Sequence, residues 1–411
     1  MEHLIGNAIV GQSGGPTAAI NATLAGVIRG VREGCAPGIG TLYGMRNGID
    51  GFLAERLIDL GATVDTEEKL SLLEHTPAAA LGSCRRKLPD PAKDPSVYEA
   101  MLALFRKYDI RYFFYIGGND SMDTVSRLSA YLADKDWEMR VIGVPKTIDN
   151  DLMGTDHTPG FGSAAKYIAV TLQEILLDCA VYTVPAVTIV EIMGRDAGWL
   201  TASAAAGGYV SGIMPDLIYL PERSFSTEQF LADVREAQKR HPNVVVAVSE
   251  GIRFADGHYV GEGAQSGAVD AFGHAYLAGA GKVLEQLVKQ ELGCKVRSVE
   301  LNLPQRCAAH LASATDLAES VGVGRAAVRA AGEGISGEMM SIDRESDAPY
   351  AVAFGHSAIG GIANRVRTVE DQYINAAGNG MTDAFRAYIL PLIEGEIKAT
   401  WEHGIPKHLV L

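Results

Sequence analysis

The sequence contains little that would mark a secreted, membrane-spanning or zinc-binding protein. Its five cysteines are scattered along 411 residues, and no CxxC or Cys/His spacing occurs, which excludes a disulfide framework and the common zinc motifs. The first ten residues, MEHLIGNAIV, lack the basic and apolar regions of a signal peptide. The most apolar stretch, residues 180–206, contains Glu191, Arg195 and Asp196, so we expect no membrane span. These absences predict a protein of a reducing, cytoplasmic compartment.

Positive charge is also scarce. Lys and Arg number 36 against 50 Asp and Glu, which gives a net charge of −14. We therefore expect no nucleic-acid partner, because such binding depends on many Lys and Arg side chains neutralising phosphates. A small phosphorylated ligand is compatible with this charge, since a local group of cations can outweigh the field of the whole protein. Such a ligand must be held by a few well-placed Arg and Lys residues.

What the sequence does contain is a series of short apolar runs, often followed by glycine, with amphipathic segments between them. The runs lack strict alternation, which is typical of strands buried on both faces of a parallel sheet. We therefore expect an α/β fold of two or three domains, with a boundary near residues 150–165. The expected strands are residues 8–10, 112–116, 141–144, 187–192 and 244–248, and the expected helices are residues 97–108, 122–133, 166–180 and 282–292.

The candidate site lies in the loops after these strands, because ligands of open α/β sheets bind beyond the carboxyl ends of the strands. Residues 11–17 (GQSGGPT) and 117–121 (GGNDS) each place glycines directly after a strand. Glycine amides and a following helix N-terminus suit an anion, and side-chain oxygens in the second loop suit a metal. Ordinary turns have the same composition, and neither a P-loop nor a GxGxxG spacing occurs.

The most informative loop is residues 145–151 (PKTIDND), which places a lysine and two carboxylates directly after a strand. Asp149 is suited to act as a general base for a substrate hydroxyl, with Asp151 tuning it. Lys146 is suited to neutralise phosphate charge. A solvated loop of the same composition is the alternative.

Two further strand ends carry charged residues. Arg195, flanked by glycines, suits bidentate contact with a phosphate, and the alternative is a surface ion pair with Asp196. Glu250 follows another strand and suits a sugar hydroxyl. Glycine-rich loops, cations and a paired carboxylate together indicate phosphoryl transfer, which needs positioning and charge neutralisation more than covalent catalysis.

Several of these motifs occur in the order found in phosphofructokinases. They are residues 13–15 (SGG), 117–121 (GGNDS), 145–151 (PKTIDND), 158–164 (TPGFGSA), 193–195 (MGR) and 250–251 (EG). The sequence thus resembles the phosphofructokinase family from residue 8 to about residue 310. The resemblance implies Mg²⁺-assisted transfer of a phosphoryl group to the 1-hydroxyl of fructose 6-phosphate. It also implies two three-layer α/β domains with mostly parallel sheets and the active site in the cleft between them.

Two positions bear on the phosphoryl donor. ATP-dependent members of the family typically carry glycine where this chain has Asp120 and Lys146, whereas diphosphate-dependent members carry Asp and Lys. The sequence therefore resembles the diphosphate-dependent type, whose reaction is usually reversible and belongs to glycolysis and gluconeogenesis. An ATP-dependent enzyme and a non-catalytic regulatory homologue are the alternatives.

The resemblance assigns a role to each motif residue. Asp149, Asp151, Arg195 and Lys146 are catalytic, with Asp149 as the proton acceptor. The sugar-phosphate site is expected to contain Thr147, Ile148, Asp149, Met193, Gly194, Arg195, Glu250, Arg297, Leu303 and Arg306. The diphosphate site is expected to contain Gly14, Gly15, Arg85, Gly118, Asp120 and Lys146, and Asn119 is the expected metal residue.

Some positions depart from the family pattern. Asn119 stands where an Asp near the magnesium is usual, and Leu303 replaces a typical His or Tyr. Ala186 stands where bacterial ATP-type enzymes have an arginine that reaches the neighbouring subunit. By resemblance, residues 1–160 with part of 305–375 form the donor-binding domain. Residues 161–304 with the C-terminal segment to 411 form the sugar-phosphate-binding domain. A homodimer or homotetramer is expected.

Overall fold

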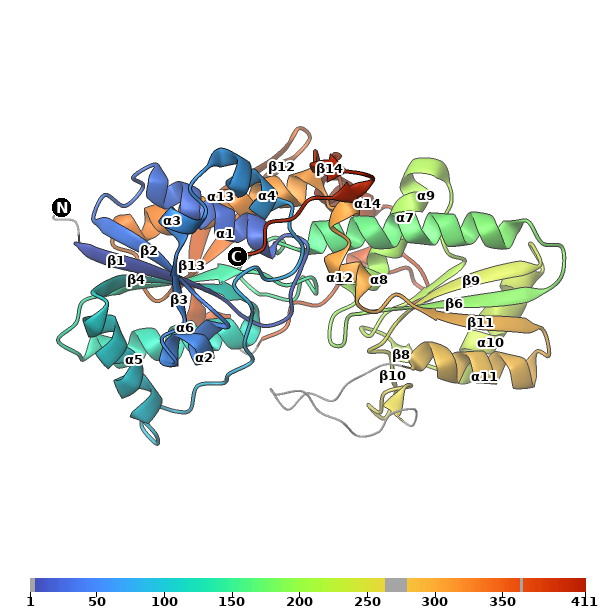
Figure 1. The fold of residues 1–411 in the computed structure, drawn as a ribbon. Coiled ribbons are helices and arrows are strands. Elements are labelled where there is room, and N and C mark those ends of the chain that lie inside the picture. The colour runs from blue at the N-terminus through green and yellow to red at the C-terminus, as the bar shows by residue number, and fades with distance from the viewer. Residues whose placement is uncertain (1–3, 263–278, 363–364) are drawn as a thin grey trace.

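The computed structural model describes residues 4–262, 279–362 and 365–411. Two main β-sheets lie side by side, each flanked by helices on both faces (Figure 1). The predicted α/β fold class is therefore confirmed. All five cysteines are unpaired. Within the part of the chain that the structure describes, no helix combines the length and apolar composition needed to cross a bilayer.

The first sheet has seven strands in the order β13-β12-β5-β4-β1-β2-β3. Its inner pairs are parallel, whereas the edge strands β13 and β3 pair antiparallel with their neighbours. The strands are β1 (Gly6–Gln12), β2 (Ile39–Met45), β3 (Leu57–Asp59), β4 (Ile110–Gly117), β5 (Arg140–Pro145), β12 (Glu338–Asp347) and β13 (Tyr350–Ala358).

The second sheet has four parallel strands in the order β11-β6-β9-β7. They are β6 (Ala186–Ile192), β7 (Leu217–Tyr219), β9 (Asn243–Ser249) and β11 (Lys295–Glu300). Two small pairs join β8 (Ser224–Phe225) to β10 (Arg253–Phe254) and β14 (Trp401–Glu402) to β15 (Ile405–Pro406).

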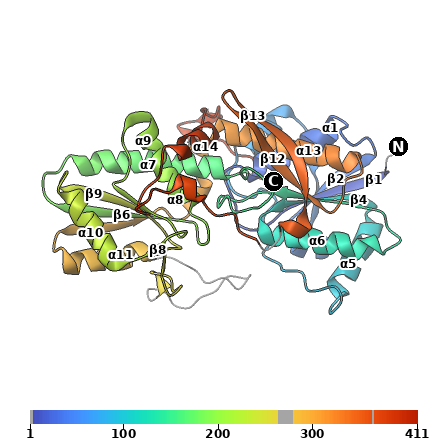
Figure 2. The same cartoon turned by 180° about the vertical axis from the view of Figure 1, so that it is seen from behind.

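Helices cover both faces of each sheet, as Figures 1 and 2 show from opposite sides. Around the first sheet lie α1 (Ile20–Arg32), α2 (Gly48–Leu53), α3 (Leu60–Thr63), α4 (Glu67–Glu74), α5 (Ser96–Lys107), α6 (Asn119–Ala133) and α13 (Ala314–Gly332). Around the second lie α7 (Phe161–Ala180), α8 (Trp199–Ala202), α9 (Ala206–Ser211), α10 (Thr227–Gln238), α11 (Ala280–Glu291), α12 (Pro304–Cys307) and α14 (Ala384–Leu392).

The absence of strict apolar alternation in the strands follows from these three layers. On β1, Ala8 and Val10 belong to the core beneath α1 and α13, whereas Ile9 belongs to the core on the opposite face. On β6, Val190 and Ile189 divide in the same way between two cores. A strand with an apolar layer on each side must be apolar at every position, because successive side chains point to opposite faces.

The predicted helices are confirmed, but two of them begin three or more residues earlier than the sequence pattern indicates. Helix α6 begins at Asn119, so the GGNDS loop is also its first turn. Helix α7 begins at Phe161 rather than near residue 166. The buried carboxylate of Asp316 accepts hydrogen bonds from the backbone N–H groups of Gly160 and Ser163, both at 2.9 Å. This cap comes from a residue more than 150 positions away, so local sequence does not reveal it.

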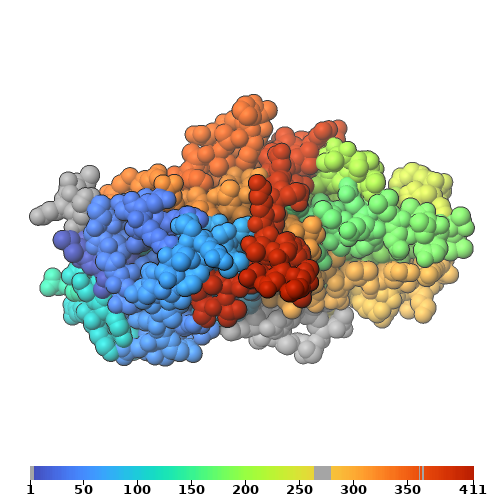
Figure 3. All heavy atoms as spheres, turned by 45° about the horizontal axis from the view of Figure 1, so that its top comes forward, coloured from blue at the N-terminus to red at the C-terminus, as the bar shows by residue number. Residues whose placement is uncertain are grey.

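The C-terminal segment contacts both halves of the molecule. In Figure 3 it runs across the surface between the N-terminal elements and α7. Phe385 and Tyr388 of α14 pack in the same core as Trp199 of α8, beside the second sheet. Leu409 and Leu411 pack instead against the core beside α1.

Candidate active site

A cavity of about 440 Å³ lies where loops from the two sheets meet. Parallel strands end at the same edge of their sheet, so the loops after β1, β4 and β5 enter the cavity from the first sheet. The loops after β6 and β9 enter it from the second. The predicted site residues that line it are Gly14, Gly15, Arg85, Gly118, Asn119, Asp120, Lys146, Thr147, Ile148, Asp149, Asp151, Met193, Arg195, Glu250 and Arg306.

The loop after β5 holds two partly buried carboxylates, those of Asp149 and Asp151. Thr147 Oγ1 accepts a hydrogen bond from the Asp149 N–H at 3.1 Å and donates one to Asp149 Oδ2 at 3.4 Å. Burial raises the pKa of Asp149. Burial and then the neighbouring Asp149 carboxylate raise the pKa of Asp151 to about 7. Raised pKa values are what a general base and its partner need in order to work near neutral pH.

Asn150 separates these two carboxylates and is fully buried. Its backbone φ of 56° lies in the left-handed region, which Asn tolerates better than most residues. The side-chain amide donates to the Tyr388 hydroxyl at 2.7 Å and accepts from the Thr158 N–H at 3.1 Å. These contacts fix the turn, and the residues on either side of Asn150 both line the cavity.

Lys146 ties the loop after β5 to the loop after β1. Its ammonium donates to the carbonyl oxygens of Ser13 at 2.9 Å and Gly15 at 2.6 Å. The side chain is only 2% exposed, and burial lowers its pKa to about 7 although Asp149 acts in the opposite direction. An ammonium has three donors, so two bonds to carbonyls leave one for a ligand.

The first turn of α6 brings Asn119 and Asp120 to the cavity. Asn119 donates from Nδ2 to Asp151 Oδ2 at 3.3 Å. Its Oδ1 is buried and has no hydrogen-bond partner within the described ranges of the chain. Asp120 Oδ1 lies 3.7 Å from the ammonium of Lys87, which also lines the cavity.

The loop after β6 is built around close backbone contacts. Gly194 has a φ of 131°, which a residue with a side chain rarely adopts, and its N–H donates to Glu250 Oε1 at 3.2 Å. A Cβ on Gly251 would lie 1.9 Å from the Arg195 carbonyl oxygen, so only glycine fits there. Burial raises the pKa of Glu250 to about 8. Among the described residues, Arg195 Nε is buried without a hydrogen-bond partner, which leaves a donor for an anionic ligand.

Five cations line this cavity of an acidic protein: Arg85, Lys87, Lys146, Arg195 and Arg306. Burial, and then the proximity of Arg85, lower the pKa of Arg306. A Cβ on Gly15 would lie 3.6 Å from Arg306 Nη1, so the glycine loop and this arginine are adjacent. Cations that repel one another in a buried cavity are stabilised by a bound polyanion.

Three predicted residues do not line this cavity. Gly194 contributes backbone contacts: its N–H donates to Glu250 and its carbonyl oxygen accepts from Ser249 Oγ at 2.6 Å. Leu303 is 52% exposed at the start of α12. Arg297 on β11 lines a different cavity of about 280 Å³, together with Thr171 and Cys179 of α7. The sugar-phosphate roles expected for Arg297 and Leu303 are therefore not explained by contacts within one copy of the chain.

The structure also brings residues to the cavity that sequence reasoning did not select. Lys87 belongs to the basic triplet at residues 85–87, and three consecutive cations are a sequence signal for an anion site. Nothing in the local sequence indicated which of the three side chains face the cavity. Asp196 lines the cavity beside Arg195 and also pairs with Arg253. Val366 comes from the C-terminal part of the chain, where no sequence signal pointed to the site.

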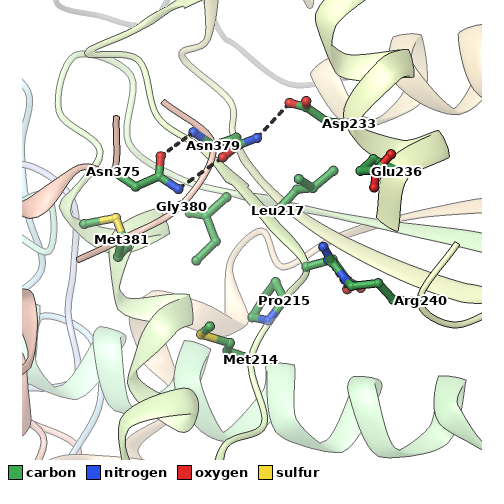
Figure 4. Close-up of a pocket in the computed structure, with 12 residues that line it drawn as sticks. Met214, Pro215, Leu217, Asp233, Glu236, Arg240, Asn375, Asn379, Gly380 and Met381 are labelled. Carbon is green, nitrogen blue, oxygen red and sulfur yellow. Dashed lines mark hydrogen bonds and ion pairs between the residues drawn. The ribbon is translucent and has the colours of Figure 1, made fainter. Parts of the chain in front are cut away.

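A separate cavity of about 290 Å³ lies near the start of β7 (Figure 4). Its polar groups already bind one another: Asp233 accepts hydrogen bonds from the Tyr219 hydroxyl at 2.8 Å and from Asn379 Nδ2 at 2.9 Å. Asp216 pairs with Arg240 at 3.3 Å. The cavity between the two sheets, where donors and acceptors lack partners, is therefore the candidate active site.

Comparison with known proteins agrees with this geometry. A family model described as "Phosphofructokinase" matches residues 7–331. The chain is 42% identical to the pyrophosphate–fructose 6-phosphate 1-phosphotransferase of Halomonas elongata, over 98% of this chain and 95% of that one. It is 44% identical to the protein of the same name from Xanthomonas campestris, over 99% and 96%. A crystal structure of a pyrophosphate-dependent phosphofructokinase from Nitrosospira multiformis superposes with a TM-score of 0.89, at 38% identity and over 99% and 96% of the two chains. The chain belongs to the phosphofructokinase family.

Proposed function

We propose that this protein transfers a phosphoryl group from diphosphate to the 1-hydroxyl of fructose 6-phosphate, giving fructose 1,6-bisphosphate and phosphate. The observation that carries this proposal is the 42% identity, over nearly the whole of both chains, to a protein named for that reaction. The site supports it with a glycine loop, five cations and a partly buried carboxylate pair in one cavity. The reaction breaks the phosphoanhydride bond of diphosphate and forms a phosphate ester. Its proposed setting is reversible use in cytoplasmic glycolysis and gluconeogenesis.

Asp149 is the proposed proton acceptor. The 1-hydroxyl oxygen attacks one phosphorus of diphosphate, the bridging P–O bond breaks, phosphate leaves, and the hydroxyl proton passes to the Asp149 carboxylate. The raised pKa of Asp149 makes it a stronger base than an exposed Asp. Asp151, with its pKa raised to about 7, can also hold the proton that the pair of carboxylates accepts.

The cations have distinct proposed tasks. Arg195, whose Nε lacks a partner within the described residues, binds the phosphoryl group in transfer. Lys146 and Arg85 bind diphosphate beside Gly14, Gly15, Gly118 and Asp120. Asp120 occupies space and places negative charge beside the donor, which disfavours a bulkier nucleotide there.

The residues present fit a magnesium ion. Asn119 offers a buried carbonyl oxygen that has no other partner among the described residues, and Asp151 lies 3.3 Å from the same side chain. Within the described ranges, no group of three or more His, Cys, Asp or Glu could hold a metal, so the remaining ligands would be water and diphosphate oxygens, as is common for Mg²⁺. When bound, the ion would neutralise phosphate charge. Asn119 and Asp151 are its proposed protein ligands.

The second sheet is the proposed sugar-phosphate side of the cleft, and the first is the donor side. Glu250, Met193, Thr147, Ile148 and Arg306 surround the proposed sugar position. We assign Arg297 and Leu303 to a site completed by a second copy of the chain. Near the end of α7, an apolar surface supports a homodimer or homotetramer; it consists of the exposed side chains Leu177, Val181, Tyr182 and Val184.

Comparing donors tests this proposal. The purified protein, with Mg²⁺ and fructose 6-phosphate, is assayed for fructose 1,6-bisphosphate in a coupled reaction with either diphosphate or ATP. We expect turnover with diphosphate and a kcat/KM for ATP lower by about a hundredfold or more, the scale of discrimination by a few polar contacts. Equal or better turnover with ATP would instead identify an ATP-dependent enzyme. No turnover with either donor would favour the non-catalytic homologue.

A further inference from the structure

The C-terminal segment around Arg367 contacts the loop that carries Asp149 and Asp151, and also Trp199 at the start of α8, directly after the Arg195 loop. The Arg367 N–H donates to the Asp151 carbonyl oxygen at 2.8 Å. Its own carbonyl oxygen accepts from the indole N–H of Trp199 at 3.0 Å, four residues beyond Arg195. One residue therefore spans the distance between a loop of the first sheet and a loop of the second.

The Arg367 side chain strengthens both contacts. Its guanidinium lies over the Trp199 ring, 4.3 Å from the ring centre. It donates from Nη1 to the Asp156 carbonyl oxygen at 2.5 Å and to the Tyr388 hydroxyl at 3.2 Å. The same hydroxyl accepts from Asn150, the residue between the two partly buried carboxylates. The guanidinium thus supports the turn at Asn150 and the start of α8 at the same time.

A second connection lies two residues further along the chain. Glu222 Oε1 accepts hydrogen bonds from the backbone N–H groups of Val369 and Gly198, both at 2.8 Å. Gly198 immediately follows the Arg195–Ala197 turn, and Arg195 and Ala197 both line the cavity. The segment from Arg367 to Val369 is therefore fixed to the arginine loop by an aromatic stack and by a shared carboxylate.

We propose that Arg367 is a positioning residue for phosphoryl transfer, which holds the Asp149–Asp151 loop and the Arg195 loop at the separation that the reaction needs. This inference rests on the proposed function. The proposed base, Asp149, follows a strand of the first sheet, and Arg195 follows a strand of the second. The distance between the two residues therefore depends on the contacts that connect their loops. Displacement of a reacting group by about 1 Å costs up to about a hundredfold in rate. Arg367 bonds Asp151 through its backbone N–H, and through its backbone carbonyl and its guanidinium it contacts Trp199, which starts α8 four residues after Arg195.

Arg344 provides a matched control. It lies in the same neighbourhood: its guanidinium is 4.8 Å from the Tyr388 ring centre, and its Nε bonds the Asp156 carboxylate at 3.2 Å. Its other bonds go to Asp347 and to the carbonyls of α14, not to either catalytic loop. Loss of Arg344 therefore removes a buried arginine of similar surroundings without releasing the loops.

The kinetic test compares Arg367→Lys and Arg367→Gln with Arg344→Lys and Arg344→Gln. Lysine keeps the charge but loses the planar group that stacks and donates in two directions. We expect both Arg367 variants to lower kcat by about tenfold to a hundredfold with each KM changed by less than about threefold. The Arg344 variants should lower the melting temperature and leave kcat within about twofold. Equal kcat losses at both positions, or KM changes that account for the whole effect, would overturn the proposal.

Hydrogen exchange gives a readout that does not depend on the reaction. In the protein without substrate, Arg367→Lys should increase amide exchange in both residues 147–151 and residues 193–199, and Arg344→Lys in neither. Faster exchange in only one loop, or in neither, would contradict the coupling of the two loops by Arg367. If wild type transfers no phosphoryl group at all, the proposed function fails while this exchange result still decides the positioning claim.

Discussion

The ammonium of Lys87 lies 3.7 Å from Oδ1 of Asp120 across the mouth of the candidate active site. Asp120 stands in the first turn of α6, where a carboxylate is favoured by the helix dipole but faces the proposed position of diphosphate. Lys87 offsets that negative charge. We therefore expect the pair, rather than Asp120 alone, to disfavour a nucleotide at this position.

Replacing Asp120 should change donor preference. Asp120→Gly removes the carboxylate and frees Lys87, so we expect the ratio of kcat/KM for ATP to that for diphosphate to rise by about tenfold or more. The measurement is the same coupled assay with both donors, and Asp134→Gly, at the exposed C-cap of the same helix, is the control for an aspartate-to-glycine change at an end of α6. An unchanged ratio would refute the donor role of Asp120.

Adding Lys146→Gly to Asp120→Gly should lower diphosphate use further. Lys146 both faces the cavity and holds the carbonyls of Ser13 and Gly15, so its loss removes a cation and loosens the glycine loop. We expect a fall of about a hundredfold in kcat/KM for diphosphate, within the range of contacts to charged groups. Retention of full diphosphate activity in the double variant would contradict the assignment.

Loss of the proposed base should affect turnover and not binding. We expect Asp149→Asn to lower kcat by about a hundredfold to ten-thousandfold, the usual contribution of a general base, with little change in KM for fructose 6-phosphate. A thermal unfolding curve checks that the variant is folded. Wild-type kcat in a folded variant would show that Asp149 is not the base.

Ionisation of the Asp151 carboxylate should lower the free energy of unfolding. Its folded pKa, about 7, lies above the ordinary Asp value of 3.8, because burial and Asp149 disfavour the charged form. Ionisation therefore favours the unfolded chain: the cost is absent below about pH 4, grows as the pH rises, and is complete above about pH 7. Urea unfolding of Asp151→Asn against wild type should show a gain in unfolding free energy at pH 8 that shrinks toward pH 5. A gain independent of pH would contradict this explanation.

His157 should also make stability fall as the pH rises, but by losing a favourable contribution rather than by gaining a cost. Burial alone would lower its pKa, but its ring nitrogens bind the carboxylates of Asp156 at 2.7 Å and Glu319 at 2.6 Å, which raises the pKa to about 9. The protonated ring therefore stabilises the fold fully below pH 6.5, by at most about 3 kcal/mol, and this contribution is lost as the pH rises through 9. Wild type should lose unfolding free energy between pH 6.5 and 9.5 more steeply than His157→Gln, and parallel curves would exclude the ion pairs.

The sequence predicted the parts of this protein whose signals are local. Continuous apolar strands predicted the α/β fold class. The loops after them, together with the resemblance to phosphofructokinases, predicted most of the residues that line the cavity. Contacts between segments that are far apart in the chain could not be predicted from the sequence. The Asp316 cap that starts α7, the pairing of Lys87 with Asp120 and the contacts of Arg367 join residues that are far apart in the chain. Arg297 was selected by motif order, but its side chain lines another cavity of the same chain.

The most direct test of the proposed reaction follows the phosphorus atoms. With Mg²⁺, fructose 6-phosphate and diphosphate as the only phosphoryl donor, phosphorus NMR should show diphosphate disappearing as equal amounts of a new C1 phosphate ester and inorganic phosphate appear. Added fructose 1,6-bisphosphate and phosphate should regenerate diphosphate. If diphosphate instead yields two phosphates without a new ester, or persists while a parallel sample with ATP as the only donor forms the ester, the protein is not a diphosphate-dependent phosphotransferase.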